Sequence, residues 1–338
     1  MSPVLFQNFE DWVTMASPSN PRPAYDPGAL TPEMLEEIAA YNSRLGPIAT
    51  HDTKAIAEAI SHAQRRNERA VFNGQQCVLV SGRPMDGKTV GVASYALGEC
   101  RRVWSKTPAL AGQTLVAPWG YLEVAEGSGL KAMATSLLSF IGAPVPSRTT
   151  ANDLMQQLRL LLPQVGMRGV IIDDSHGIAG AKNEASRAFA GALKAMITGL
   201  PVTLVIVGVE LESSALEGVR GDEVRLRGEM VHTGRWSEPG PKKAGPWGQL
   251  VDRLSRLLEI PASPGCSGMR RRDFVTRLAE ASDGRPGLAI EWVKEAAESA
   301  VMNDVALDLD TLEATSEYPA RRLSTVVPVK PARRRRAG

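Results

Sequence analysis

Short apolar runs alternate with longer amphipathic stretches through the middle of the chain. The apolar runs predict strands at residues 77–80, within 114–124, at 169–173 and at 202–207. Apolar residues at helical spacing predict helices over about 88–103, 130–141, 151–162 and 184–197. Strands that are apolar throughout are typical of a parallel sheet with helices on both faces. The pattern therefore predicts an α/β core.

Only helical periodicity is visible on either side of this core. Thr31 before Pro32 and Glu33 has the composition of a helix start. A loop rich in Pro, Gly and Lys at 234–248 marks a boundary before further helical patterns. The expected segments are a mobile arm at 1–30, N-terminal helices at 31–70, the α/β core at 71–240, a helical lid at 245–316 and a disordered basic tail at 317–338.

Composition excludes several classes of protein. The chain has 338 residues, of which 43% are hydrophobic, which is enough for a sizeable core. Its three cysteines are too few and too scattered for a disulfide framework or a zinc cluster, and they fit a reducing compartment. We expect a cytoplasmic protein, because no signal peptide or membrane-spanning run is apparent.

The net charge of only +2 hides an asymmetry. Residues 1–50 hold six acidic and two basic side chains, whereas residues 319–338 hold seven basic side chains and no acidic one. The small total at first argues against a nucleic-acid partner. The basic tail nevertheless offers a sequence-independent contact to phosphates, a handle for a partner protein, or a segment that serves only solubility.

The segment from Gly82 to Thr89 matches the phosphate-binding pattern G-x-x-x-x-G-K-[ST], and it lies between a predicted strand and a predicted helix. Its glycines allow consecutive N–H groups to face phosphates, and the helix N-terminus adds a favourable dipole. Lys88 is expected to reach the β- and γ-phosphates of ATP, and Thr89 to bind Mg²⁺. The expected nucleotide contacts come from Gly82, Asp86, Gly87, Lys88, Thr89 and Val90.

The second half of the expected site is acidic and lies where the apolar strand at 169–173 ends. Asp173 is expected to hold Mg²⁺ through water, and Asp174 to orient the attacking water. Many ATPases have glutamate at the second position, and aspartate is one methylene shorter, so we expect slow ATP hydrolysis. His176 follows two residues later and is either structural or a link to a neighbouring subunit.

With these motifs and the helical region after the sheet, the chain resembles an AAA+ ATPase. Five further segments carry a narrower resemblance, namely residues 51–60, 173–178, 189–194, 205–209 and 282–287. With them, the chain resembles the TniB/TnsC family of AAA+ transposition regulators, whose role is similar to that of MuB, over about residues 31–315.

The resemblance implies a ring or helical filament of many copies on double-stranded DNA. Such an assembly recruits a DDE transposase, and also a TniQ-like adaptor, and ATP hydrolysis dismantles it. The family shares its active site between neighbours, so Arg225, Arg227 or Arg235 would contact the γ-phosphate of the next subunit. Arg285 would be an arginine of the lid that reaches the nucleotide. Each of these arginines has an ordinary surface role as its alternative.

The resemblance also implies contacts to the DNA backbone from the segment between the second and third strands. Arg148 and Thr150 occupy that place, and Lys131 and Lys182 are further candidates. Thr150 has a helix-capping role as its alternative.

Two other functions are compatible with the same motifs. The first is a replication-initiation loader or a signalling or defence ATPase, and the second is a nucleotide-binding scaffold that does not hydrolyse ATP.

Overall fold

The computed structural model describes residues 8–16, 20–70, 75–106, 116–123, 128–173, 184–211, 219–240 and 245–324. The chain forms two compact units. The core unit contains residues 1–21 and 49–234, and the helical unit contains residues 22–48 and 235–338. Among the described residues, no helix is both long enough and apolar enough to cross a membrane.

The core unit is built on one five-stranded sheet in the order β2-β3-β4-β1-β5. The strands are β1 (Cys77–Ser81), β2 (Trp119–Glu123), β3 (Gly169–Asp173), β4 (Thr203–Gly208) and β5 (Gly228–His232). Every neighbouring pair is parallel. The register places Ser81 beside Gly208 and His232, and Glu123 beside Asp173. All five carboxyl ends therefore lie along the same edge.

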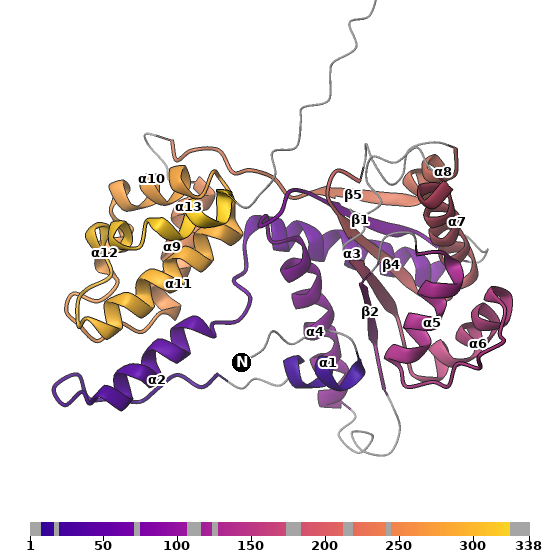
Figure 1. The fold of residues 1–338 in the computed structure, drawn as a ribbon, viewed down its shortest axis with the longest axis horizontal. Coiled ribbons are helices and arrows are strands. Elements are labelled where there is room, and N and C mark those ends of the chain that lie inside the picture. The colour runs from indigo at the N-terminus through magenta and orange to yellow at the C-terminus, as the bar shows by residue number, and fades with distance from the viewer. Residues whose placement is uncertain are drawn as a thin grey trace, which may run out of the picture. The chain divides into compact units, whose positions relative to one another are not determined.

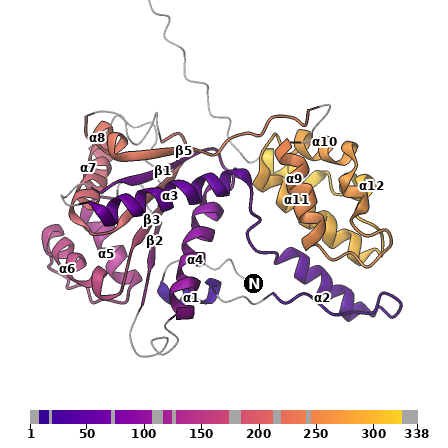
Figure 2. The same cartoon turned by 180° about the vertical axis from the view of Figure 1, so that it is seen from behind.

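Helices cover both faces of this sheet (Figures 1 and 2). One face carries α1 (Phe9–Ala16), α3 (His51–Arg69) and α4 (Lys88–Lys106). The other carries α5 (Leu130–Phe140), α6 (Ala151–Gln164), α7 (Glu184–Gly199) and α8 (Val219–Arg227). In α3, the buried positions Ile56, Ala59, Ile60 and Ala63 follow helical spacing and face the sheet and α4.

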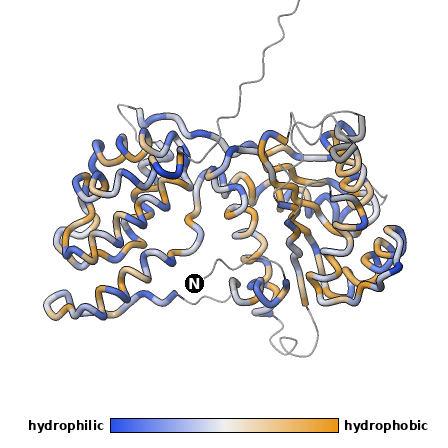
Figure 3. Tube along the Cα trace, in the orientation of Figure 1, coloured by the Kyte–Doolittle hydropathy of each residue, from blue (hydrophilic) through white to orange (hydrophobic). Residues whose placement is uncertain are grey.

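Burial explains which strands the sequence predicts. Every residue of β1, β3 and β4 is buried, and the tube in Figure 3 is strongly hydrophobic through this sheet. Edge strand β5 has no fully buried residue, and only two of its five residues, Met230 and Val231, are apolar. The hydrophobic pattern therefore gave no sign of β5.

The helical unit contains α2 (Pro32–Ser43), α9 (Gly245–Leu257), the 3₁₀ turn η3 (Ser267–Arg270), α10 (Arg272–Ala281), α11 (Pro286–Met302), α12 (Leu309–Ala314) and α13 (Glu317–Ser324). Its core includes the fully buried Trp247, Phe274 and Trp292. Helix α2 packs along α11. The buried Asn42 ties α2 to this unit, because its side-chain amide donates to Glu259 O at 2.8 Å and accepts from Glu259 N at 2.9 Å.

Two segments differ from the expected ends of the chain. Residues 9–16, within the expected mobile arm, form α1, and Trp12 is completely buried against the core unit. Two turns of helix are too short to show a clear period, but Phe9 and Trp12 stand three positions apart on one face. Residues 317–324, at the start of the expected disordered tail, form α13, with Pro319 buried and Tyr318 packed against the helical core.

Candidate active site

The phosphate-binding segment forms a tight loop between β1 and the first turn of α4. Gly82 N donates to Gly208 O at 3.3 Å, which ties the start of the loop to β4. The Asp86 carboxylate accepts from Arg83 N at 2.7 Å, so it braces the loop from within. Met85 and Gly87 have φ values of 67° and 83°, which lets the backbone reverse in this short space. The predicted strand-loop-helix context is present.

Gly82 is required by the close approach of the chain after β5. A Cβ at this position would lie 2.0 Å from Thr233 Oγ1 and 2.6 Å from Thr233 O. Thr233 is fixed there because its N–H donates to Ser81 O at 2.8 Å. No side chain fits between β1 and this segment, so glycine is needed here for space. At Gly87, by contrast, an added Cβ would meet nothing within 4 Å, and the positive φ is the constraint.

Lys88 begins α4 and is only 9% exposed. Its ammonium group donates to Arg83 O at 2.7 Å, so it reaches back across the loop. Thr89 is partly exposed in the next position, and Val90 is half exposed. A cation and a helix N-terminus at the same point provide a site for an anionic group such as a phosphate.

Asp173 ends β3 and is 5% exposed. The hydroxyl group of Tyr121, on the neighbouring strand β2, donates to Asp173 Oδ2 at 2.8 Å. The predicted residues Asp174, His176 and Lys182 lie outside the described residues. Asp173 is therefore the residue of the predicted acidic element that the structure describes, and it lies at the same edge of the sheet as the loop before Lys88.

The donor atoms at this edge fit Mg²⁺, which prefers oxygen ligands and keeps several waters. The Thr89 hydroxyl and the Asp173 carboxylate would be the protein ligands. In the part of the chain that is described, no three His, Cys, Asp or Glu side chains gather into a metal cluster.

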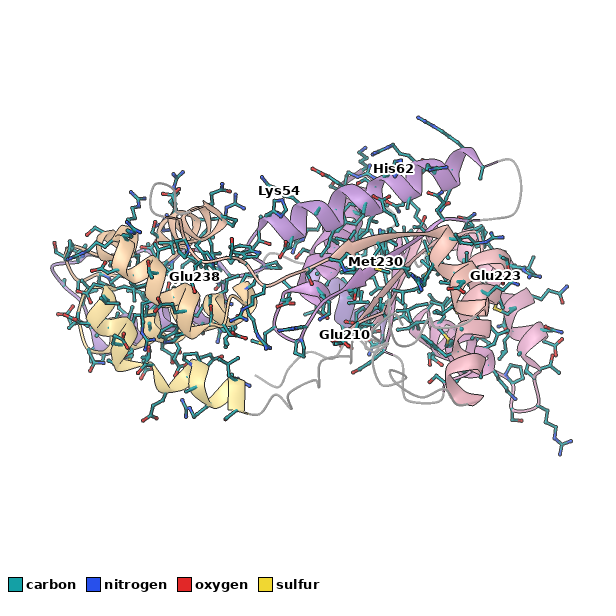
Figure 4. All side chains as sticks on the ribbon, turned by 90° about the horizontal axis from the view of Figure 1, so that it is seen from above. Lys54, His62, Glu210, Glu223, Met230 and Glu238 are labelled. Atoms are coloured by element: carbon teal, nitrogen blue, oxygen red, sulfur yellow. The ribbon has the colours of Figure 1, made fainter. Side chains whose placement is uncertain are left out.

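The chain turns sharply after β4. Glu210 has a φ of 49°, and Leu211 N donates to Ser81 Oγ at 3.1 Å, which returns the segment to the end of β1. Figure 4 labels Glu210 close to the end of the strands and Glu223 on α8. Glu210 thus lies two positions after Gly208, the last residue of the strand that separates β1 from β3.

The candidate arginines lie in both units. On α8, Arg225 is exposed and pairs with Asp222 at 3.5 Å, and Arg227 is partly exposed. In the helical unit, Arg235 pairs with Asp283, and Arg285 precedes α11, is 8% exposed and lies 3.6 Å from Asp283. These ion pairs account for the observed positions of three of the side chains, and a contact of any of the four with a nucleotide stays a prediction.

The candidate DNA contacts lie around α5 and α6. Lys131 is exposed in the first turn of α5, and Arg148 is exposed in the loop that follows this helix. Thr150 is the N-cap of α6, where its hydroxyl group accepts from Asp153 N at 3.2 Å and the Asp153 carboxylate accepts from Thr150 N at 3.1 Å. The alternative capping role of Thr150 is thus observed, and its contact with DNA stays a prediction.

Two residues of the site were not identified from the sequence. Thr233 follows β5, whose hydrophobic pattern is weak, so nothing indicated its approach to Gly82. Tyr121 had a signal, since it carries the only hydroxyl group in β2. Its partner on another strand could be known only from the fold.

The sequence also matches the profile of a known protein family. The profile of the family described as "Bacterial TniB protein" matches residues 47–238. The chain belongs to the TniB family. The matched region runs from just before α3 to just after β5 and so contains both halves of the candidate site. No protein among those with curated functions matches this TniB-family chain.

Solved structures resemble the TniB-family chain at low sequence identity. The Aeropyrum pernix ORC2 protein, described in ADPNP–ADP complexes, has a TM-score of 0.56 at 16% identity, covering 84% of this chain and 73% of that one. Cdc6p from Pyrobaculum aerophilum has a TM-score of 0.52 at 15% identity, covering 84% of this chain and 73% of that one. Drosophila ORC bound to DNA has a TM-score of 0.53 at 13% identity, covering 88% of this chain and 69% of that one. These likenesses confirm the predicted AAA+ fold, with its helical C-terminal part.

Replacement of Gly82 by alanine tests the loop geometry. Because the added Cβ would overlap Thr233, we expect Gly82→Ala to lower the free energy of unfolding by about 1–3 kcal/mol. Gly98→Ala is the matched control, since Gly98 is exposed within α4 and an added Cβ meets nothing within 4 Å. That control should stabilise the protein by about 0.5–1 kcal/mol. Chemical denaturation measures both, and equal effects of the two substitutions would contradict the close approach.

Proposed function

We propose that this chain is an ATP-dependent DNA-binding regulator of transposition. It would assemble as a ring or filament on target DNA and recruit or activate a DDE transposase, with ATP hydrolysis driving disassembly. The observation that supports this best is that the phosphate-binding loop before Lys88 and the strand end at Asp173 lie at the same sheet edge in a member of the TniB family. Membership of that family favours transposition over a replication-initiation loader or a signalling ATPase.

The loop and α4 would bind the phosphates of ATP. The backbone N–H groups around Gly82 and Gly87 and the helix N-terminus would hold the β-phosphate, and Lys88 would move from Arg83 O to the phosphate oxygens. Bound Mg²⁺ would neutralise charge on the phosphates. Thr89 and Asp173 would hold this ion, and Arg285 would contact the nucleotide from the helical unit.

Two of the similar structures support the proposed binding of nucleotide and DNA. ORC2 of Aeropyrum pernix is described with ADPNP and ADP, and the Drosophila ORC is described bound to DNA. For this chain we propose ATP as the nucleotide and double-stranded DNA of any sequence as the partner. Lys131, Arg148, Thr150 and Lys182 are the proposed contacts to the DNA backbone, which implies an affinity that falls with salt.

Assembly would complete the active site. An arginine from a neighbouring copy, Arg225 or Arg227, would stabilise the charge on the γ-phosphate, as arginines do in many phosphoryl-transfer sites. Both belong to α8, and Leu226 between them is 88% exposed. A homo-oligomer formed through this helix would couple nucleotide state to assembly. The transposase and a TniQ-like adaptor would bind the assembled form.

Exchange of Asp174 for glutamate tests the proposal that hydrolysis is slow. If Asp174 is too short to orient the attacking water well, Asp174→Glu should raise the steady-state turnover about tenfold or more, because a well-placed base contributes strongly to the rate. Phosphate release in the presence of DNA measures this. A slower glutamate variant, or a wild-type turnover as fast as that of motor ATPases, would contradict the assignment.

Truncation of Lys88 tests the proposed function as a whole. Loss of a charged hydrogen bond to phosphate costs about 1.5–3 kcal/mol, so Lys88→Ala should weaken ATP binding roughly 10- to 100-fold. It should also abolish ATP-dependent binding to duplex DNA. Lys106→Ala, at the exposed end of the same helix, is the control and should bind ATP normally. Fluorescence titration with an ATP analogue and a DNA mobility shift measure these effects, and unchanged binding by Lys88→Ala would refute the proposal.

A further inference from the structure

The carboxylate of Asp173 is held by a residue to which the proposed reaction gives no role. Tyr121 is 9% exposed, and its hydroxyl group donates to Asp173 Oδ2 at 2.8 Å. The bond joins neighbouring strands, because β2 pairs with β3 through Trp119 to Glu123. A hydrogen bond from a buried donor to one oxygen restricts rotation of the carboxylate about its Cβ–Cγ bond. The direction in which Asp173 presents its oxygens therefore depends on Tyr121.

The ring of Tyr121 is in turn held by the N-terminal helix α1. Trp12 is completely buried, and its ring centroid lies 6.0 Å from that of Tyr121 at an angle of 33°. Trp12 is itself fixed, because its Nε1–H group donates to Cys100 Sγ on α4 at 3.3 Å. Burial raises the pKa of the Cys100 thiol to about 11, so this acceptor stays neutral. A continuous set of contacts therefore links α1 to Asp173.

A second aromatic contact anchors α1 on the same unit. Phe9 meets the rings of Trp104 and Phe140 edge to face, at centroid distances of 5.9 and 6.4 Å. These partners come from α4 and α5, which lie on opposite faces of the sheet. Helix α1 thus docks through two aromatic side chains, and only one of them, Trp12, contacts Tyr121.

We propose that Tyr121 is a positioning residue for Asp173, and that Trp12 of α1 keeps the Tyr121 hydroxyl group in place. The proposal rests on the proposed function, since Asp173 matters in this way only if it holds Mg²⁺ beside a nucleotide. Groups that orient metal ligands typically change metal affinity or activity 10- to 100-fold when they are removed. A merely structural tyrosine would leave metal binding unchanged, because the hydroxyl group would only satisfy a buried carboxylate.

The test removes the hydroxyl group and keeps the ring. In the full-length chain, Tyr121→Phe should raise the Mg²⁺ or Mn²⁺ concentration needed for half-maximal binding of a fluorescent ATP analogue about tenfold. Binding of the same analogue in EDTA should stay at the wild-type value, because the loop and Lys88 are untouched. Electron paramagnetic resonance of Mn²⁺ with a slowly hydrolysed analogue gives the metal affinity without any turnover.

Tyr95→Phe is the matched control. The hydroxyl group of Tyr95 is also partly buried and hydrogen-bonded, to Ser61 Oγ at 3.0 Å and to Gln64 Oε1 at 2.8 Å, but these partners lie on α3. The Mg²⁺ or Mn²⁺ concentration that Tyr95→Phe needs for half-maximal binding of the analogue should equal that of the wild type. An unchanged metal dependence in Tyr121→Phe, or the same change in Tyr95→Phe, would overturn the proposal. If the wild-type chain binds no nucleotide at all, the proposed function itself has failed, which is a separate result.

A second variant tests the part of Trp12. Trp12→Ala should raise the metal requirement in the same direction as Tyr121→Phe, and the double variant should be no worse than Tyr121→Phe alone, because both changes act through one hydroxyl group. Phe9→Ala loosens α1 without touching Tyr121 and should have a smaller effect. Additive effects of Trp12→Ala and Tyr121→Phe would show that Trp12 acts by another route and would overturn this part of the proposal.

Discussion

The parallel pairing of all five strands is the constraint on which the site depends. It brings every carboxyl end to one edge, so the loop after β1, the turn after β4 and the last residue of β3 lie along a single line. Strand β4 separates β1 from β3, so Lys88, after the loop that follows β1, and Asp173 belong to strands that are not neighbours in the sheet. The same edge collects Glu210 and Thr233, from the segments that follow β4 and β5.

This arrangement places charged groups where burial is costly, and each has a compensating contact. Lys88 donates to Arg83 O, and Asp173 accepts from Tyr121, so neither charge is left without a hydrogen bond. The two contacts differ in kind. The first is made to the backbone of the loop and can be exchanged for a phosphate oxygen. The second comes from a buried side chain with an aromatic neighbour, which suits a permanent support.

A feature could be predicted from the sequence when the residues that form it lie close together along the chain. The phosphate loop could be identified because strand, loop and helix follow one another directly, and Asp173 because it ends a short apolar run. Strands β1, β3 and β4 could be predicted because all their residues are buried and most are apolar. Strand β5 was missed because it is an edge strand with only two apolar residues. The close approach of Thr233 to Gly82 and the hydrogen bond from Tyr121 to Asp173 both depend on the order of the strands in the sheet. No local sequence pattern contains that order. The attachment of α2 to the helical unit depends in the same way on Asn42 and Glu259, which are 217 positions apart.

In the mechanism that we propose, nucleotide bound at this edge controls assembly on DNA. Electron microscopy of the 338-residue chain with duplex DNA, with and without a slowly hydrolysed ATP analogue, is the decisive measurement. We expect rings or filaments on DNA only when the analogue is present, and none with the Lys88→Ala variant. Absence of any such assembly with nucleotide, or an identical assembly without it, would show that nucleotide does not control assembly.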